Sequence, residues 1–215
     1  MEHQVSFSFS GRYFTLGDKT SATQTWFVLH GYGQLARFFI RKFRALESKN
    51  IYVVAPEGLS RFYLDDDVNQ RLQSSNNRVG ATWMTRENRL TDIRNYITFL
   101  DTVYSNEVSD AATVTVLGFS QGAATASRWA CEGSMKYDRL ILWGGILPPD
   151  LDLGQDATTI RSRETIFVKG TSDPFMNDAR FLEMNQLSEK LGIAPRVITY
   201  DGGHDIVEAT LLQLV

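Results

Sequence analysis

Residues 113–131 read TVTVLGFSQGAATASRWAC and carry the strongest structural signal in the chain. The run 113–117 is rich in β-branched residues and typical of a buried strand, whereas 121–131 is Ala-rich, as expected of a helix. Between them, GFSQG at 118–122 matches G-x-S-x-G, a sharp turn that holds its serine in a strained conformation between two glycines. This pattern predicts that Ser120 is a nucleophile at the carboxyl edge of a sheet. The alternative is an ordinary turn whose serine caps a helix.

The rest of the chain alternates short apolar runs with longer segments of helical spacing. We expect strands at 25–29, 51–55, 113–117, 139–143, 165–169 and 196–200, and helices at 38–48, 91–104, 121–131, 178–191 and 205–214. This alternation predicts an α/β fold with a mostly parallel twisted sheet and helices on both faces. Two further runs, 5–9 and 13–16, are joined by a short Gly-containing connection and predict an antiparallel N-terminal hairpin.

Length and composition favour one domain over residues 1–215. The 43% of hydrophobic residues exclude a mainly disordered chain, and a net charge of −3 argues against binding nucleic acid through its phosphates. The long polar segment 56–83 predicts a loop or small lid beside a site. Its acidic run, Asp65, Asp66 and Asp67, lacks the spacing of a calcium loop, so we expect a solvated loop face and no metal.

Cys131 is the only cysteine, which excludes an internal disulfide and any zinc site that needs two thiolates. We expect it to be a small buried apolar side chain. The sequence contains no basic segment followed by an apolar run at its start, and no stretch of 18 apolar residues. A cytoplasmic location without integral membrane association is therefore expected. The oligomeric state stays open between monomer and homodimer.

A serine nucleophile needs a base, and the chain contains three histidines. His204 follows the last expected strand and is the predicted base, although a capping or surface histidine is the simpler alternative. The matching carboxylate is expected at Asp173, directly after the strand 165–169, in the chain order Ser, Asp, His of α/β-hydrolases. Asp178 and Asp201 are the competing carboxylates. The alternative for Asp173 is a turn residue without a catalytic role, since Asp before Pro is common in turns.

Acyl transfer also needs hydrogen-bond donors for the oxygen that becomes negative. One predicted donor is the backbone N–H of Gln121, the residue after Ser120. The second is expected in the loop HGYGQ at 30–34, where we select the backbone N–H of Tyr32. His30 is then predicted to hold this loop through hydrogen bonds, with a direct chemical role as the alternative.

These motifs together resemble the phospholipase/carboxylesterase family of α/β-hydrolases, which includes acyl-protein thioesterases and small bacterial predicted esterases. The resemblance rests on HGYG at 30–33, GFSQG at 118–122, GGILP at 144–148, DP at 173–174 and GHD at 203–205. It implies a compact α/β-hydrolase without a large cap domain, acting on esters or thioesters without a cofactor. It also implies that Ser120, Asp173 and His204 form a catalytic triad, with Tyr32 and Gln121 as the oxyanion donors.

The expected activity is a carboxylesterase for small-molecule esters of short to medium acyl chains. Tyr32 and Gln34 replace the Leu and Asp usual in the corresponding loop of the thioesterases, and the segment 56–83 is polar where those enzymes line an acyl channel. A thioesterase or lipase-type activity on acyl-proteins or lysophospholipids is the first alternative, and a non-catalytic ligand-binding homologue is the second. Predicted substrate contacts are Trp83, Met84, Ile146, Leu147, Phe175 and Met176, each of which could equally belong to the core.

Overall fold

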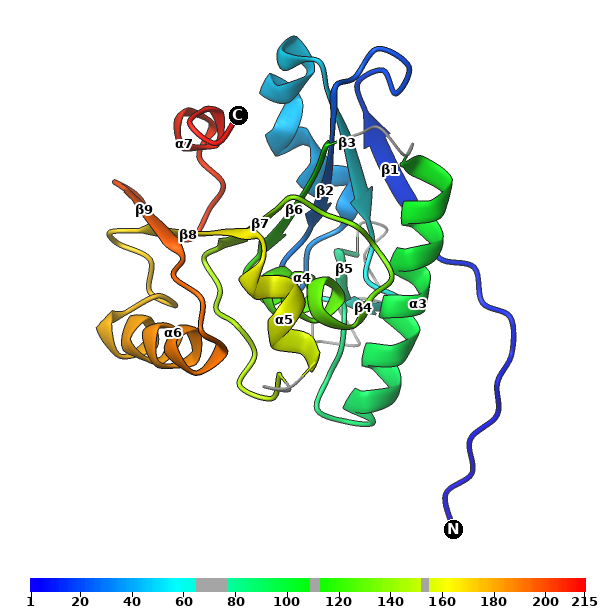
Figure 1. The fold of residues 1–215 in the computed structure, drawn as a ribbon. Helices are drawn as coiled ribbons and strands as arrows, with labels where there is room; N and C mark the ends of the chain where they lie inside the picture. The colour runs from blue at the N-terminus through cyan, green and yellow to red at the C-terminus, as the bar shows by residue number, and fades with distance from the viewer. Residues whose placement is uncertain (65–76, 109–112, 152–154) are drawn as a thin grey trace.

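The computed structural model describes residues 1–64, 77–108, 113–151 and 155–215. Seven strands form one sheet in the order β1-β3-β2-β6-β7-β8-β9 (Figure 1). They are β1 (Tyr13–Leu16), β2 (Gln24–Leu29), β3 (Ile51–Pro56), β6 (Thr113–Phe119), β7 (Arg139–Trp143), β8 (Glu164–Gly170) and β9 (Arg196–Tyr200). Only β1 runs antiparallel to its neighbour within this sheet, and the remaining pairs are parallel. The predicted α/β-hydrolase fold class is confirmed.

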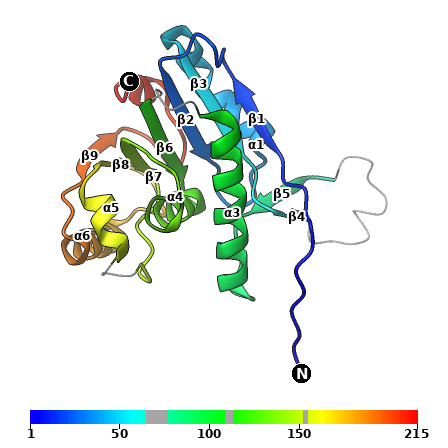
Figure 2. The same cartoon turned by 45° about the vertical axis from the view of Figure 1, so that its right-hand side comes forward.

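Helices cover both faces of this sheet because its central strands are apolar on both sides (Figures 1 and 2). One core packs the sheet against α3 (Arg89–Glu107), α4 (Gln121–Glu132), α5 (Gln155–Arg161) and α6 (Asp178–Leu191). The other core packs it against α1 (Ala36–Phe39), the 3-10 helix η1 (Ile40–Lys49) and α7 (Glu208–Leu212). The sheet is therefore the middle layer of three.

The prediction of an N-terminal hairpin is wrong for its first strand. Residues 5–9 form no strand, and their apolar side chains Val5, Phe7 and Phe9 are exposed. The second run forms β1 as expected, but β1 pairs with β3 from Tyr13 opposite Pro56 onward. An alternating pattern produces a strand only where a partner offers hydrogen bonds and a surface to cover, and β3 provides both to β1.

Three further expectations need correction. The helix expected over 38–48 is α1 followed by η1, since helical spacing does not separate an α-helix from a 3-10 helix. The last helix begins at Glu208 and not at 205, because the residues before it form a turn tied to the Tyr200 hydroxyl, which lies 2.7 Å from the carbonyl oxygens of Gly203 and Asp205. The short helix α5 was not expected at all.

The segment 56–83 is not only a loop. It contains an antiparallel pair, β4 (Ser60–Tyr63) and β5 (Val79–Thr82), which stands apart from the main sheet in Figure 2. A bridge between Ala81 and Gln34 joins this pair to the loop after β2. Residues 65–76 lie outside the described part of the chain, so the idea that the segment moves as a lid stays a prediction, as does the role of Asp65, Asp66 and Asp67.

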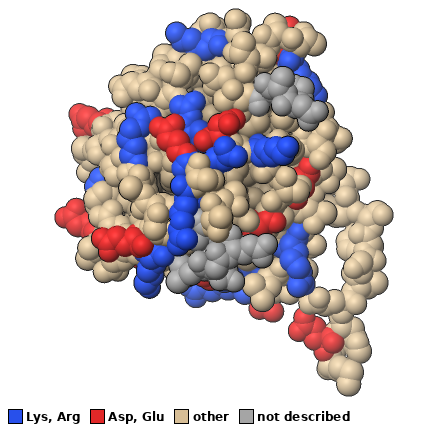
Figure 3. Space-filling view, in the orientation of Figure 1, with Lys and Arg blue, Asp and Glu red and all other residues tan. Residues whose placement is uncertain are grey.

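Charges of both signs are interspersed on the face seen in Figure 3. This face therefore carries no single-sign patch, and the absence of nucleic-acid binding stays a prediction from the net charge of −3. Among the described residues, no helix combines the length and apolarity that crossing a bilayer requires.

Candidate active site

The site lies where the strand order reverses. From β2 the chain continues to β3 on one side, whereas β6 lies on the other side and leads on to β7. The loops after β2 and β6 therefore diverge and leave a crevice at the carboxyl ends of these strands, the usual ligand position in open α/β sheets. Ser120 follows β6, and the loop 30–34 follows β2.

Ser120 occupies the predicted sharp turn between β6 and α4. Its φ of 55° and ψ of −118° lie outside the conformations that a side chain normally adopts. The turn needs glycine on both sides, because a Cβ at Gly118 would lie 2.2 Å from the Gly122 oxygen and one at Gly122 would lie 2.2 Å from the Leu29 oxygen. The backbone N–H of Ser120 donates to the Trp143 oxygen at 2.9 Å, which fixes the turn to β7.

His204 and Asp173 form a close pair after β9 and β8. The Nδ1 of His204 lies 2.7 Å from Oδ2 of Asp173, whose side chain is fully buried. The other carboxylate oxygen accepts the backbone N–H of Phe175 at 2.9 Å. Because a carboxylate only accepts, the proton of a neutral imidazole lies on Nδ1, and Nε2 keeps its lone pair. The rings of Phe119 and Phe175, each 4.7 Å from the imidazole centroid, hold its orientation.

Gly144 and Gly145, after β7, lie against this pair and against Ser120. A Cβ at Gly144 would lie 3.0 Å from Cε1 of His204 and 3.3 Å from Oδ2 of Asp173, and one at Gly145 would lie 2.5 Å from the Ser120 oxygen. The structure therefore brings Ser120, Asp173 and His204 around one dipeptide. The competing carboxylates are elsewhere: Asp178 begins α6, and Asp201 accepts from the Thr171 hydroxyl at 3.2 Å.

His30 is buried behind the site and has the holding role that the sequence suggested. Its Nδ1 donates to the Gly31 oxygen at 2.7 Å, and its Nε2 accepts the backbone N–H of Gly58 at 2.9 Å. Its own carbonyl accepts the indole N–H of Trp83 at 2.8 Å. Nε2 thus joins the loop after β2 to the loop after β3, while Nδ1 is engaged within the loop after β2, so neither ring nitrogen is left to accept a proton from substrate.

The stability of the fold is expected to fall in acid because of His30. Burial lowers the pKa of His30 to about 4, from about 6.5 in an unfolded chain. The unfolded chain therefore binds more protons, so this stabilisation is complete above about pH 6.5 and is lost as pH falls toward 4, by on the order of 3 kcal/mol. Urea unfolding across this pH range should show the decline. His30→Gln, which cannot titrate, should have a shallower one, and an equally steep decline in that variant would contradict the assignment.

The loop after β2 is fixed directly beside Ser120. Within it, the side-chain oxygen of Gln34 accepts the backbone N–H of Gly31 at 2.9 Å, and Gly33 adopts a φ of 73°. The N–H of Gly33 donates to the Ala81 oxygen at 2.9 Å, and a Cβ at Gly31 would lie 3.1 Å from the Ser120 Cβ.

The two expected oxyanion donors are backbone groups of Tyr32 and Gln121. Their N–H groups form no hydrogen bond to any part of the chain that the structure describes. For Gln121 this follows from its place in the first turn of α4, where N–H groups have no intrahelical partner. Both groups therefore have donor capacity left for an oxygen next to Ser120. The side chain of Tyr32 is exposed and stacks on Phe62 at 5.1 Å.

Some of the residues expected to contact substrate are fully buried. Trp83 and Leu147 are 1% and 0% exposed and belong to the core, and Trp83 packs on His30. Their assignment as surface contacts is therefore not supported. Ile146 and Met176 are nearly buried, Met84 is half-buried, and Phe175 is exposed beside His204. Cys131 is also half-buried, less so than expected.

A family model described as serine hydrolase (FSH1) matches residues 20–209. The chain belongs to this family of serine hydrolases. Among solved structures, acyl-protein thioesterase 2 of Zea mays aligns with a TM-score of 0.71 at 16% identity, over 95% of this chain and 96% of the other. A carboxylesterase of Bacillus cereus aligns at 0.67 and 15% identity, over 95% and 91%. A phospholipase/carboxylesterase of Dyadobacter fermentans aligns at 0.66 and 18%, over 98% and 97%. No curated protein matches the sequence significantly.

The family assignment confirms the suspected relation, and at these identities the solved structures support the fold alone. The described residues hold no group of three or more His, Cys, Asp or Glu side chains suited to a metal ion. The absence of a cofactor from the reaction remains a prediction, as does the cytoplasmic location.

One functional contact of this serine hydrolase was missed from the sequence. The sequence indicated only the backbone N–H of Gln121 as functional. In the structure, its side-chain amide also joins α4 to the segment after β5. Its nitrogen donates to the Met84 oxygen at 3.0 Å, and its oxygen accepts the backbone N–H of Trp83 at 3.2 Å. No local pattern reveals such a contact, because the partners are 37 and 38 residues away.

Removing this amide is expected to loosen the segment beside the site. Gln121→Ala keeps the backbone donor but leaves the partners at Met84 and Trp83 without the side chain, so the free energy of unfolding should fall by about 1–3 kcal/mol. Chemical denaturation measures the change. Gln186→Ala, at an exposed position of α6, is the matched control and should be neutral. Equal denaturation midpoints for both variants would mean that the Gln121 amide contributes nothing to the stability of the fold.

Proposed function

We propose that this serine hydrolase is a carboxylesterase that cleaves small esters of short to medium acyl chains through an acyl-enzyme on Ser120, as a single α/β-hydrolase domain. The observation that carries the proposal is the pair formed by Asp173 and His204, 2.7 Å apart and packed against the same glycines as the strained turn of Ser120. All three residues follow strands of the same sheet, and a base already oriented by a carboxylate is what activation of a serine requires.

The chemistry follows from these groups. The Ser120 oxygen attacks the ester carbonyl carbon while Nε2 of His204 takes the hydroxyl proton. The carbonyl oxygen becomes an oxyanion and receives the N–H groups of Tyr32 and Gln121. The bond to the alcohol oxygen then breaks, and His204 returns its proton to the departing alcohol. Water repeats these steps on the acyl-enzyme and releases the carboxylic acid and free Ser120.

Asp173 has two tasks in this scheme. It keeps the imidazole in the tautomer whose Nε2 can accept a proton, and it stabilises the positive charge that forms on His204. Its buried side chain, held by the N–H of Phe175, makes this orientation rigid. A rigid base is catalytically useful because no reorganisation is needed when charge develops.

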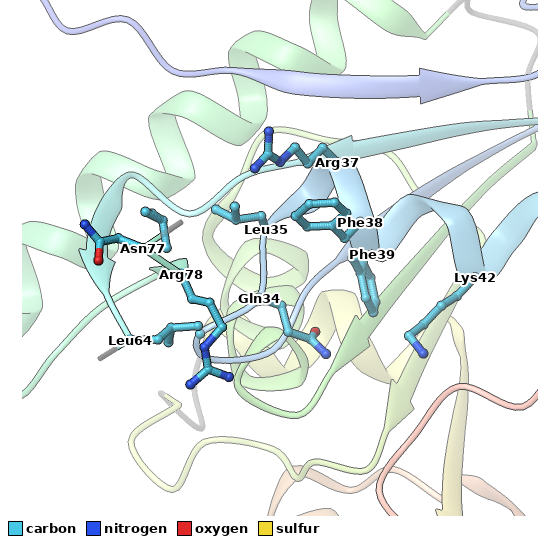
Figure 4. A pocket seen from close by; sticks show the side chains of 11 residues that line it. Gln34, Leu35, Arg37, Phe38, Phe39, Lys42, Leu64, Asn77 and Arg78 are labelled. Carbon is cyan, nitrogen blue, oxygen red and sulfur yellow. The ribbon is translucent and has the colours of Figure 1, made fainter. Parts of the chain in front are cut away.

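The acyl-chain range is supported by a cavity of about 380 Å³ beside the oxyanion loop. This volume is near the lower end for small-molecule sites, which suits a short or medium chain better than a long one. The apolar side chains of its lining come from Leu35, Phe38, Phe39, Leu64 and Val79 (Figure 4). An activity on acyl-proteins or lysophospholipids is the second candidate, and the likeness to a plant acyl-protein thioesterase is the observation that favours it.

Two measurements test the proposal. A fluorophosphonate probe should label Ser120, as identified by peptide mapping, and absence of labelling would favour a non-catalytic ligand-binding protein. A series of p-nitrophenyl esters from acetate to palmitate, beside palmitoyl thioester, should give the highest kcat/KM on short to medium chains. A higher kcat/KM on the long-chain thioester would instead support the thioesterase.

A further inference from the structure

Trp143 connects the nucleophile to the base through the inside of the fold. It is the last residue of β7 and is fully buried. Its backbone carbonyl accepts the N–H of Ser120 at 2.9 Å, and its indole N–H donates to the carbonyl of Asp205 at 2.9 Å. Asp205 directly follows His204 in the chain. A single residue is therefore bonded both to the backbone of Ser120 and to the backbone beside His204.

Tyr200, the last residue of β9, contacts the same segment. Its hydroxyl oxygen lies 2.7 Å from the carbonyl oxygens of both Gly203 and Asp205, the two residues that flank His204. A hydroxyl has one proton and can donate to only one of these carbonyls at a time, whereas the indole of Trp143 supplies a second donor. The two rings also pack on each other, with their centroids 5.6 Å apart. Trp143 and Tyr200 thus form one buried unit at the backbone of His204.

His204 needs this support because its own segment has no regular structure. Residues 201–205 form a series of bends, and the two residues before the histidine are both glycine. Glycine restricts the backbone less than any other residue, so this segment does not by itself fix where His204 lies. Asp173 orients the imidazole, but the backbone decides how close the imidazole comes to Ser120.

The distance between Ser120 and His204 is where this support acts. No hydrogen bond joins these two side chains, both of which lie in the described part of the chain. Catalytic hydrogen bonds often tighten only when substrate binds, so the backbones must already hold the two groups within reach of each other. A displacement of about 1 Å between reacting groups can lower a rate by about 10². A small shift of the segment that carries His204 is therefore costly.

We propose that Trp143 and Tyr200 are positioning residues that set the distance between Ser120 and His204; this inference rests on the proposed function. Both side chains are buried, so they act through the backbone of residues 203–205 and not on the reacting atoms. Their loss should slow acylation and deacylation alike, because His204 moves a proton in each step. The values of kcat and kcat/KM should then fall by the same factor, with KM unchanged.

Tyr200→Phe tests the role of the hydroxyl, since it keeps the ring that packs on Trp143. With p-nitrophenyl butyrate as substrate, kcat and kcat/KM should each fall about tenfold. The rate constant for labelling of Ser120 by a fluorophosphonate should fall with them, because the serine attacks phosphorus with the help of the same base.

Tyr137→Phe is the matched control, because it makes the same chemical change at another buried tyrosine. The Tyr137 hydroxyl has no hydrogen-bond partner among the described residues, so this variant should keep the wild-type kcat within about twofold.

Ile141→Val controls for a general loss of stability. Ile141 lies on β7 in the same core as Trp143 and Tyr200, and loss of its methyl group should lower the urea midpoint without removing a bond to the segment of His204. This variant should also keep kcat. An equal loss of kcat in Ile141→Val and Tyr200→Phe would mean that Tyr200 only stabilises the fold, and would overturn the inference.

Trp143→Phe tests the indole. This variant keeps the carbonyl that accepts from Ser120 but lacks the indole N–H, so its kcat should also fall about tenfold. The double variant with Tyr200→Phe should lose more than either single variant, because both donors to the carbonyls beside His204 are then gone. A double variant with the same kcat as Tyr200→Phe would show that the indole does not position His204.

The outcomes separate this inference from the proposed function. If the wild type hydrolyses the ester and both Tyr200→Phe and Trp143→Phe keep kcat within about twofold, the inference is wrong and the esterase stands. If the wild type neither hydrolyses esters nor is labelled at Ser120, the proposed function fails and this inference fails with it.

Discussion

Ser120→Ala is expected to reduce ester hydrolysis to the background rate, a loss on the order of 10⁶ in kcat if a serine-protease precedent transfers. Without Oγ no acyl-enzyme can form, and the remaining donors and base can assist only direct attack by water. The fold should survive, because the variant keeps the backbone hydrogen bond from residue 120 to the Trp143 oxygen and the glycines of the turn. Hydrolysis of p-nitrophenyl butyrate and circular dichroism measure the two properties.

The matched control for this variant is Ser172→Ala. Ser172 is an exposed serine on the loop after β8, next to Asp173, and its hydroxyl forms no hydrogen bond with the described residues. The control should keep both its turnover and its reaction with a fluorophosphonate, whereas Ser120→Ala loses both. Turnover at the wild-type rate in pure Ser120→Ala, or labelling of another serine, would exclude an acyl-enzyme on Ser120.

The sheet was predictable where burial alone decides it. The strands expected at 139–143 and 196–200 have the bounds of β7 and β9, and the strand expected at 51–55 ends one residue before β3 does. In these strands a run of apolar or β-branched residues between turn signals leaves few alternatives. Residues 5–9 carry a comparable pattern but remain exposed and pair with no strand, although β1 is the edge strand of the sheet. An alternating pattern therefore does not by itself produce a strand, since pairing also needs apolar surface to cover.

Within the site, chain order and loop position were enough to pair Asp173 with His204, since both follow strands that end at one edge. The exposure of the apolar residues nearby was harder to predict. Trp83 and Phe175 carry similar side chains, yet one is 1% and the other 66% exposed, and only the packing of His30 and Tyr96 against the indole explains the difference. The same reasoning applies to Gln121, whose side-chain partners come from a distant segment.

Asp173→Asn is expected to lower kcat by about 10⁴ near neutral pH, as in the protease precedent. The hydrogen bonds around Asp173 dictate this outcome. One carboxylate oxygen accepts the N–H of Phe175, so an amide at this position must put its oxygen there and turn its NH₂ group toward Nδ1 of His204. Nδ1 must then accept, which moves the ring proton to Nε2, and an Nε2 that carries a proton cannot take one from Ser120.

The competing carboxylates make this prediction selective. Asp178→Asn and Asp201→Asn remove the same charge from the same region but leave the contact between Asp173 and His204 intact, so both should keep wild-type turnover within about threefold. Thermal unfolding should be similar in all three variants if Asp173 acts on the reaction and not on the fold. Since only the tautomer of His204 separates Asp173→Asn from its controls, full activity in Asp173→Asn together with a steep loss in Asp178→Asn would move the orienting carboxylate to α6. It would also remove the geometric basis on which the esterase is proposed.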